Sequence, residues 1–464
     1  MFFELYFLIG ALLLFLFIGV KASRGITVSD FENNSSSTNI YQLVLSILAS
    51  LLGGFMFFGL TALSYESGVV SFIIGLGYSI GLLILAHYSG PIFSLMRDAD
   101  APTMDAVVGM KFGKEVYGLV VIINFTFFIS VLSAQFIVFS DVISHFNGGH
   151  NETVMYVLMS ATVVGYSIFS GYKGVLKTDI IQFIFILIII ITLLYTIFHD
   201  QSLDWVASLP NEYFTGLAEG PVFLIGVLVF FPLTLMARTD LWQRIGSASN
   251  ARDAKIALKL VAIVIPIFYL VFTVFGMFSA AQSNNVDPTS AFLTTAISSF
   301  SFGNPIDSIL SSLLLLGIVA ALVSTIDTNL NVVSVAVGKK IASKVGKEPG
   351  LTHYRIFVVI FGVFGAVAPF YLNDLVDVIV GAATMLLLML PLVIISILVN
   401  KPLSGTLRMS AAVGLALGYF CCMYLLFNGN PKTAFLPSIA IAIIPLLVVF
   451  IWKKVSEYFK AQEQ

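Results

Sequence analysis

The sequence predicts an all-α polytopic membrane protein, and its composition, its apolar runs and the positions of its basic residues support that prediction. Hydrophobic residues make up 58% of the chain and charged residues 10%, with a mean hydropathy of +1.00. These values lie far from those of a soluble globular protein. The net charge of −2 gives no sign of a nucleic-acid partner, so the lipid bilayer is the expected surroundings.

Thirteen apolar runs are long enough to cross about 30 Å of hydrocarbon. They lie at 2–20, 40–64, 69–96, 114–146, 153–171, 178–198, 217–243, 254–281, 304–337, 353–372, 374–399, 406–427 and 434–452. The first run is expected to be retained, because Glu4 stands where a signal peptide has basic residues and no small-residue cleavage site follows. No long polar linker divides the runs, which predicts a single membrane domain over residues 1–464.

The basic residues predict the orientation of these spans. All 23 lysines and arginines except Lys432 fall on alternate connections between the apolar runs. By the positive-inside rule, the amino terminus is outside and the carboxyl terminus is cytoplasmic. The expected location is the plasma membrane, which in a bacterium is the inner membrane.

Two spans contain residues that break helices. The span at 40–64 has Gly53, Gly54 and Gly59 near its middle, and the span at 217–243 has Pro221 and Pro232. Breaks matter in a membrane helix because the freed backbone groups must line a cavity or bind something. Taken singly, the glycines could simply permit close packing and Pro232 could be an ordinary kink.

The second interrupted span comes five spans after the first, which is the arrangement of an inverted repeat of five plus five helices with its binding site at the breaks. The predicted divisions are an extra amino-terminal helix at 2–20, a first repeat at 40–198, a second repeat at 217–399 and two carboxyl-terminal helices at 406–452.

Few polar residues lie within the spans, and charges buried there are costly unless they are paired or solvated. Asp179 begins the span at 178–198, where it could instead be a helix-terminal acid with Thr178 as the cap. The stretch 320–331 places Ser324, Thr325 and Thr328 on one helical face, with Asp327 beside them. Such hard oxygens suit an alkali or alkaline-earth cation. The alternative is that the hydroxyls bond back to carbonyls of their own helix.

Cys421 and Cys422 are adjacent in one predicted helix and point to different faces. They therefore indicate neither a disulfide framework nor a metal site. Nothing in the sequence determines the oligomeric state, and a monomer is the working expectation.

Four segments carry motifs that occur together in one family. They are Gly171–Gln182 with Thr178-Asp179-x-x-Gln182, Thr239–Arg252 with Gln243-Arg244, Ala320–Asn331 with Ala-Ala-x-x-Ser-Thr, and Gly59–Gly68 with Gly59-Leu60 and Tyr65. Taken together, and in their order along the chain, these segments resemble the sodium/solute symporter family, which includes the proline, pantothenate, sialic acid and sodium/glucose transporters. The likeness covers nearly the whole chain.

The resemblance implies the leucine-transporter fold, with a sodium ion bound between the first core helix and the span at 304–337. The matching positions imply that its ligands are the backbone carbonyls of Ala49, Leu52 and Ala321 and the hydroxyls of Ser324 and Thr325. Some members bind a second cation with the acid that matches Asp179. Here that implies a second cation site formed by Asp179, Ser324, Asp327 and Thr328.

The chain also departs from the family pattern. Leu51 and Met56 stand where the proline and sugar transporters use polar or charged side chains. A sugar needs many fixed hydrogen bonds, so an amino acid or organic acid is the expected small-molecule substrate. The expected contacts are the helix-terminal amides near Gly53 and the side chains of Phe55, Met56, Gln135, Phe230 and Phe231, although Gln135 could instead be a helix-packing amide.

The expected function is sodium-coupled symport of a small organic solute by alternating access, without covalent chemistry. A proton-coupled transporter on the same fold is one alternative, because carboxylates can exchange protons. A transporter-like solute sensor is another. A conducting channel is disfavoured by breaks at matched repeat positions.

Overall fold

The computed structural model is helical over the residues that it describes. These are residues 10–462 with gaps at 11–12, 15, 22–23, 99–100, 147–151, 199–202, 283–285, 299–304, 346–347, 372–374, 400 and 429–433. Most of the predicted first span, 2–20, lies outside the described residues.

The first half of the chain has long helices over the apolar runs between residues 40 and 198, together with two short helices that the runs did not indicate, α2 and α6. The elements are α2 (Val28–Asn33), η1 (Asn34–Ser36), α3 (Ile40–Leu51), η2 (Phe55–Gly59), α4 (Leu60–Ser67), α5 (Val70–Asp98), α6 (Met104–Phe112), α7 (Lys114–Phe146) and α8 (Glu152–Phe198).

The second half begins with two short 3-10 segments and repeats the pattern of long apolar helices. The elements are η3 (Leu203–Ser208), η4 (Asn211–Phe214), α9 (Gly220–Ile225), η5 (Gly226–Phe230), α10 (Phe231–Thr234), η6 (Leu235–Ala237), α11 (Thr239–Ser247), α12 (Ala251–Gln282), η7 (Pro288–Ser290), α13 (Ala291–Ser298), α14 (Pro305–Val345), α15 (Leu351–Val367), η8 (Ala368–Phe370), α16 (Leu375–Leu398), α17 (Gly405–Asn428) and α18 (Phe435–Gln462).

The first core helix is broken where the glycines predict it. Helix α3 ends at Leu51, and the chain resumes at Phe55 with a bend of 52° between the two halves. Leu52 leaves the helical region at φ −89° and ψ 53°. Gly53 and Gly54 fit this place because a side chain at either position would meet α14 or Gln135.

The matching helix of the second half is perturbed differently from the expected interruption. Residues Gly220–Ala237 run on as one span, without a bend as sharp as that of the first core helix. The perturbation is a π-helical turn, η5, directly before α10, which contains Pro232. A π turn relieves the hydrogen bond that a proline cannot donate, so the chain need not separate. The first core helix has its own π turn, η2, after the break.

The boundary between the spans at 153–171 and 178–198 was predicted too late in the chain. Helix α8 covers 47 residues and changes direction at Gly171, whose φ is 51°. At 1.5 Å per residue the whole of α8 would measure roughly 70 Å, about twice one crossing. Because helical geometry resumes at Tyr172, Asp179 lies about two turns inside the second part of α8 instead of at its start.

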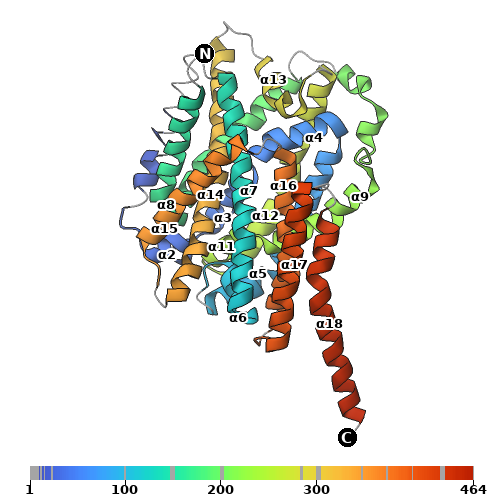
Figure 1. Cartoon of the computed structure of the whole chain (residues 1–464). Coiled ribbons are helices and arrows are strands. Elements are labelled where there is room, and N and C mark those ends of the chain that lie inside the picture. Colours follow the sequence, from blue (N-terminus) through green and yellow to red (C-terminus); the bar gives the residue numbers. More distant parts are fainter. Residues whose placement is uncertain are drawn as a thin grey trace.

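The helices form one bundle with two distinct ends (Figure 1). Helix α6 lies at the end drawn at the bottom, here called the α6 end, α2 lies at the side of the bundle in its lower half, and α4 and α13 lie at the opposite end. Among the described residues, nine helices are long and apolar enough to cross a membrane, and the bent α3–α4 pair makes a tenth. The protein is therefore a multi-pass membrane protein, while the count of thirteen spans stays a prediction.

Candidate functional site

The break in the first core helix is held by a side chain from each of two neighbouring helices. Gln135 of α7 accepts a hydrogen bond from the Gly54 N–H at 2.7 Å, so that amide does not continue the helix. A Cβ at Gly53 would collide with Thr325 Oγ1 of α14. The Thr325 hydroxyl oxygen therefore faces the break directly. The carbonyls of the last turn of α3, which includes Ala49, are those that a helix end leaves free to bind other groups.

The two adjacent hydroxyls of α14 both donate their protons within the protein. Ser324 donates to Asp179 Oδ1 of α8 at 2.6 Å, and Thr325 donates to the Ala321 carbonyl at 3.2 Å. The second bond is the local helix bond that sequence analysis offered as the alternative. A hydroxyl that has donated its proton still has oxygen lone pairs, which are the groups that bind a cation.

Asp179 is fully buried and accepts hydrogen bonds from two helices. Ser324 reaches Oδ1 and Ser46 of α3 reaches Oδ2. The interpretation of Thr178 as an amino-terminal cap is wrong, because its hydroxyl donates to the Gly174 and Val175 carbonyls inside α8. Asp179 thus joins α8 to α3 and α14, the helices on either side of the predicted sodium site.

A buried arginine side chain also lies in this cluster, although the sequence placed that residue in a connection. Arg244 of α11 is 1% exposed, and its Nη2 lies 3.9 Å from Asp179 Oδ2. The same nitrogen donates to Thr328 Oγ1 at 3.3 Å and to the Ser46 carbonyl at 3.4 Å. The positive charge of Arg244 therefore stands between two members of the predicted second cation site.

Asp327 is the other carboxylate of the predicted second site. Its Oδ2 accepts a hydrogen bond from Thr178 at 3.4 Å, and its Oδ1 is buried without a hydrogen-bond partner. Both amide atoms of Gln182, one turn after Asp179 on α8, are also buried without partners. The structure therefore brings Asp179, Asp327 and Thr328 to one α8–α14–α11 contact and leaves several polar atoms there unsatisfied.

The predicted substrate contacts are spread over three helices. Phe55 and Met56 lie on η2, Gln135 lies on α7, and Phe230 and Phe231 lie where η5 meets α10. Helix α16 packs against both η2 and α10. The Phe231 ring packs edge-on against Tyr78 of α5, with 4.8 Å between the ring centroids. Gln135 is the member of this set whose bond to the broken helix is defined, and the shared pocket stays a prediction.

At the α6 end, the segment 31–38 closes over the site. Gln243 of α11 donates to the Glu32 carbonyl and, at 2.9 Å, to Asn331 Oδ1 of α14. Asn331 donates to the Phe31 carbonyl at 3.0 Å, and Tyr354 of α15 donates to the Glu32 carboxylate. Backbone bonds of Thr38 to residues 247 and 249 continue the closure.

Basic residues from distant parts of the sequence meet residues 30–36 at the same end. Lys173 pairs with Asp30 at 3.3 Å, Lys339 pairs with Glu32 at 3.2 Å, and Arg97 donates to the Ser36 carbonyl. These three basic residues therefore lie at one end of the bundle, and the orientation of the chain in the membrane stays a prediction.

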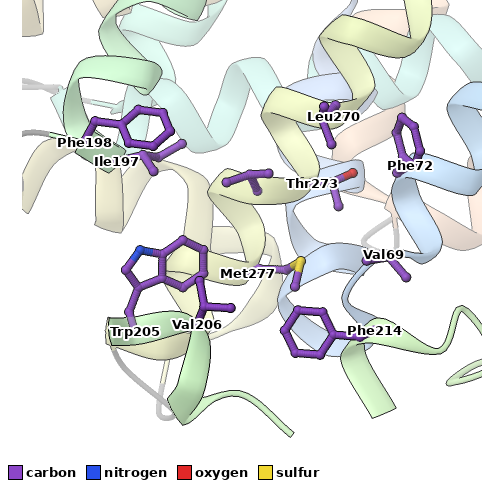
Figure 2. Close-up of a pocket in the computed structure, with 11 residues that line it drawn as sticks. Val69, Phe72, Ile197, Phe198, Trp205, Val206, Phe214, Leu270, Thr273 and Met277 are labelled. Atoms are coloured by element: carbon purple, nitrogen blue, oxygen red, sulfur yellow. The ribbon is translucent and has the colours of Figure 1, made fainter. Parts of the chain in front are cut away.

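A cavity of about 280 Å³ lies away from this site, between α5, α8, α12 and the 3-10 segments after α8 (Figure 2). Its lining is apolar except for Thr273, whose hydroxyl donates to the Tyr269 carbonyl at 2.8 Å, and the ring nitrogen of Trp205, which has no partner among the described residues. Phe214 and Met277 are among the apolar lining residues. A single free N–H group cannot orient a polar solute, so this cavity is not the candidate site.

Comparison with known proteins identifies the fold. No family model matches the sequence, and no curated protein matches it. Among solved structures, a sodium-coupled sialic acid symporter in a substrate-bound outward-open state matches with a TM-score of 0.77 and 20% identity, covering 95% of this chain and 96% of that chain. Mhp1, a nucleobase-cation-symport-1 family transporter in a closed conformation, matches with a TM-score of 0.56 and 14% identity over 90% of this chain and 92% of that chain. The chain therefore shares the fold of these transporters, as expected for the leucine-transporter fold.

Proposed function

We propose that this protein is a sodium-coupled symporter that accumulates a small organic solute, either an amino acid or an organic acid. The observation that carries the proposal is the Thr325 hydroxyl, which faces the glycine break of the first core helix beside Ser324. A freed helix end and two hydroxyl oxygens supply the hard-oxygen ligands that an alkali cation requires. The fold, shared with transporters of that kind, supports the same assignment.

In this proposal the sodium ligands are the carbonyls of Ala49, Leu52 and Ala321 and the hydroxyls of Ser324 and Thr325. Sodium supplies charge at the break and draws α14 and α3 together. The chain positions the ligands through the Ser324–Asp179 bond and through the Gly54–Gln135 bond. Both bonds hold the break open at the depth of the hydroxyls.

The solute is proposed to bind next to the break. Backbone amides at a broken helix favour an anionic group such as a carboxylate. Phe55, Met56, Phe230 and Phe231 supply apolar surface for the remainder of the solute, and Gln135 supplies a polar contact. A sugar is disfavoured because η2 offers few fixed side-chain hydrogen bonds.

Alternating access then requires the α6 end to open. We propose that this end faces the cytoplasm, as the basic residues predict, and that residues 31–38 separate from α11, α14 and α15 when sodium and solute leave. The hydrogen bonds of Gln243, Asn331 and Tyr354 to that segment are those that must break. Five helices in each repeat, an extracellular amino terminus, a monomeric state and a plasma-membrane location belong to the same proposal.

A second cation site formed by Asp179, Ser324, Asp327 and Thr328 is also proposed. Its supports are the unpartnered Asp327 Oδ1 and the meeting of both carboxylates at one buried contact. Arg244 already balances Asp179, so the second cation is expected to bind on the Asp327 side. Cation binding there would use the oxygen that the protein leaves unsatisfied.

A thermal-shift screen of the purified protein tests the function. Amino acids, organic acids and sugars are added in sodium chloride and, separately, in potassium chloride. A ligand at about 100 times its Kd stabilises the native state by about 2.7 kcal/mol. We expect an amino acid or organic acid to raise the melting temperature in sodium only, and then to enter proteoliposomes down an inward sodium gradient.

Three outcomes would replace the proposal. Uptake that follows an imposed pH gradient equally well without sodium would assign proton coupling. Sodium-dependent binding without any uptake would assign a sensor. Uptake of a sugar would contradict the proposed substrate class, an amino acid or organic acid, and would leave the proposal of sodium coupling unchanged.

A further inference from the structure

A buried acid outside the candidate site joins three helices at the α6 end. Asp105 on α6, Asn124 on α7 and Thr239, the first residue of α11, are each 1% exposed or less. The Asn124 amide donates one hydrogen bond to Asp105 Oδ1 and another, of 2.6 Å, to Thr239 Oγ1. The side chains therefore connect the α5–α7 connection of the first half with the segment after the perturbed helix of the second half.

Half of the polar atoms in this cluster lack a partner. Asp105 Oδ2, Asn124 Oδ1 and the hydroxyl of the neighbouring Thr103 are all buried without a hydrogen bond. All three are oxygens, and the Asn124 nitrogen is already shared between two acceptors. The Thr103 hydroxyl carries a hydrogen that it can donate to Asp105, whereas Asn124 Oδ1 can only accept and has no donor among the described residues.

The Asp105 carboxylate forms no ion pair with any basic side chain among the described residues. An unpaired carboxylate away from water is so costly that the group takes up a proton instead.

The charged and titratable groups on the packed elements are engaged elsewhere. Helix α11 brings Asp240, which is bound by Arg238 at 2.7 Å and by Arg244 at 3.8 Å. Helix α7 brings Tyr117, whose ring lies 4.0 Å from Lys340 Nζ of α14, and that Nζ donates to the Lys114 carbonyl. Arg97 of α5 donates to the Ser36 and Ala248 carbonyls. Lys111 lies six residues further along α6, on a different face of that helix. Helix α16 has no charged side chain between Gly381 and Leu398.

An acid in the first turn of a helix commonly stabilises the amino terminus as a charged group. That effect is worth about 0.3–1 kcal/mol at an exposed site. Helix α6 begins at Met104, so Asp105 is placed for such a role. Its complete burial costs more than this gain, and an unpartnered Oδ2 is not what a solvated helix-terminal carboxylate would have.

We propose that Asp105 is a proton-binding site, occupied in this conformation, whose proton holds α6 and α7 against the start of α11. The proton removes the uncompensated charge and gives the Asp105 carboxyl a hydrogen to donate, and Asn124 Oδ1 is a buried acceptor of the same cluster without a partner among the described residues. Asp105 lies on α6, outside the membrane-spanning helices, and burial raises its pKa to about 7. The inference does not depend on the proposed function.

The sign of the pH effect follows from the difference between the pKa of Asp105 in the packed state and its pKa in a state that exposes it to water. In a state that exposes Asp105 to water, the pKa of its carboxyl returns to about 3.9. Because the packed pKa is higher, the stabilisation from the proton is complete below the exposed pKa and is lost as the pH rises through about 7. Between the exposed and the packed pKa, the packed arrangement loses about tenfold in its equilibrium constant per pH unit, and above about pH 7 the loss levels off because both states are then ionised.

Infrared spectroscopy of the purified protein detects the proton directly. The carbonyl stretch of a protonated carboxylic acid is compared between the unmodified protein, Asp105→Asn and Glu115→Gln, the last being a control at an exposed acid on the adjacent helix. We expect one acid band to be lost in Asp105→Asn only, and in the unmodified protein to lose half its intensity near pH 7. Identical spectra for the unmodified protein and Asp105→Asn would overturn the proposal.

Thermal unfolding against pH gives a second, independent measurement. The melting temperature of the unmodified protein should fall from about pH 4 to about pH 7 and then level off, whereas Asp105→Asn, a neutral mimic, should lose less over this range and exceed it above pH 7. Should Asp105→Asn fail to fold, Asn124→Leu retains the acid and removes its donor, and the acid band should then persist to higher pH. A melting temperature rescued by sodium at alkaline pH, without any acid band, would assign a cation to this site instead.

Discussion

At the scale of single residues, the hydroxyls of Ser324 and Thr325 donate their hydrogen bonds to different helices: Ser324 donates to Asp179 of α8, and Thr325 donates to a carbonyl of its own helix, α14. Replacing either residue with alanine removes one oxygen ligand from the proposed sodium site while the helix backbone stays intact. We expect sodium affinity to fall about tenfold in each variant, equivalent to about 1.4 kcal/mol. Sodium titration of the melting temperature measures this change.

Ser334→Ala is the matched control for these substitutions. Ser334 is buried on the same helix, but its hydroxyl donates only to the Leu330 and Asn331 carbonyls. It should leave sodium affinity unchanged. A Ser324→Ala, Thr325→Ala double variant with unaltered sodium dependence would remove both residues from the site.

Arg244 and Asp179 offer a test of a buried charge balance. Arg244→Gln leaves Asp179 without its neighbouring guanidinium, and breaking a buried pair in this way typically costs about 3–5 kcal/mol. Because the separation of 3.9 Å is long, the low end of that range is expected. Adding Asp179→Asn should restore at least half of the lost melting temperature. Simple additivity in this double-mutant cycle would show that the two charges are not coupled.

These residues also mark what sequence patterns can and cannot show. Asp179, Ser324 and Asp327 were predicted to be neighbours because polar residues inside apolar spans are rare and motif positions match. Arg244 was assigned to a connection because its motif is short and follows an apolar run. Asp105 was not singled out, since an acid beside Thr103 in a polar connection has the pattern of an ordinary helix start.

At the scale of elements, the break in the first core helix depends on the absence of side chains. A Cβ at Gly53 would collide with Thr325 Oγ1 and lie 3.2 Å from Gln135 Oε1. Gly53→Ala should therefore displace α14 from the break and lower sodium affinity by more than either hydroxyl variant does. Sodium titration of the purified variant measures the loss.

Gly165→Ala on α8 is the control for this prediction, since a Cβ there meets no atom within 4 Å. It should retain sodium affinity and could gain about 0.5–1 kcal/mol of stability from helix propensity. Equal sodium affinity in Gly53→Ala and Gly165→Ala would separate the glycine break from cation binding.

Element boundaries show the limits of hydropathy. The glycines at 53–54 predicted a real break, whereas Pro232 produced a π turn instead of an interruption, because a local change of helix type absorbs a missing N–H. Lys173 and Lys177 suggested a connection, yet both lie within the second part of α8. Long side chains near a helix end can reach the polar boundary, so their charge does not terminate a helix.

At the scale of the whole molecule, the order of long helices was predictable because each apolar run must be long enough to cross the bilayer. The closure at the α6 end could not be predicted from the sequence. It depends on Gln243 and Asn331 donating to the backbone carbonyls of Glu32 and Phe31, and on Tyr354 donating to the Glu32 carboxylate. These partners lie more than 200 residues apart in the chain, and sequence periodicity carries no information on such pairings.

The number of cations per cycle is a property of the whole molecule, because each sodium ion that enters adds about 2.3 kcal/mol of driving force per 100 mV. With both proposed sites occupied, sodium activation of uptake should have a Hill coefficient near two. Asp327→Asn removes the carboxylate whose Oδ1 has no partner, so the coefficient should fall toward one and uptake should become less dependent on pH. Glu212→Gln, at an exposed acid of η4, should change neither. A coefficient of one in the unmodified protein would leave Arg244 as the fixed positive charge of this cluster, with a single sodium ion at the Ser324–Thr325 site providing all of the coupling.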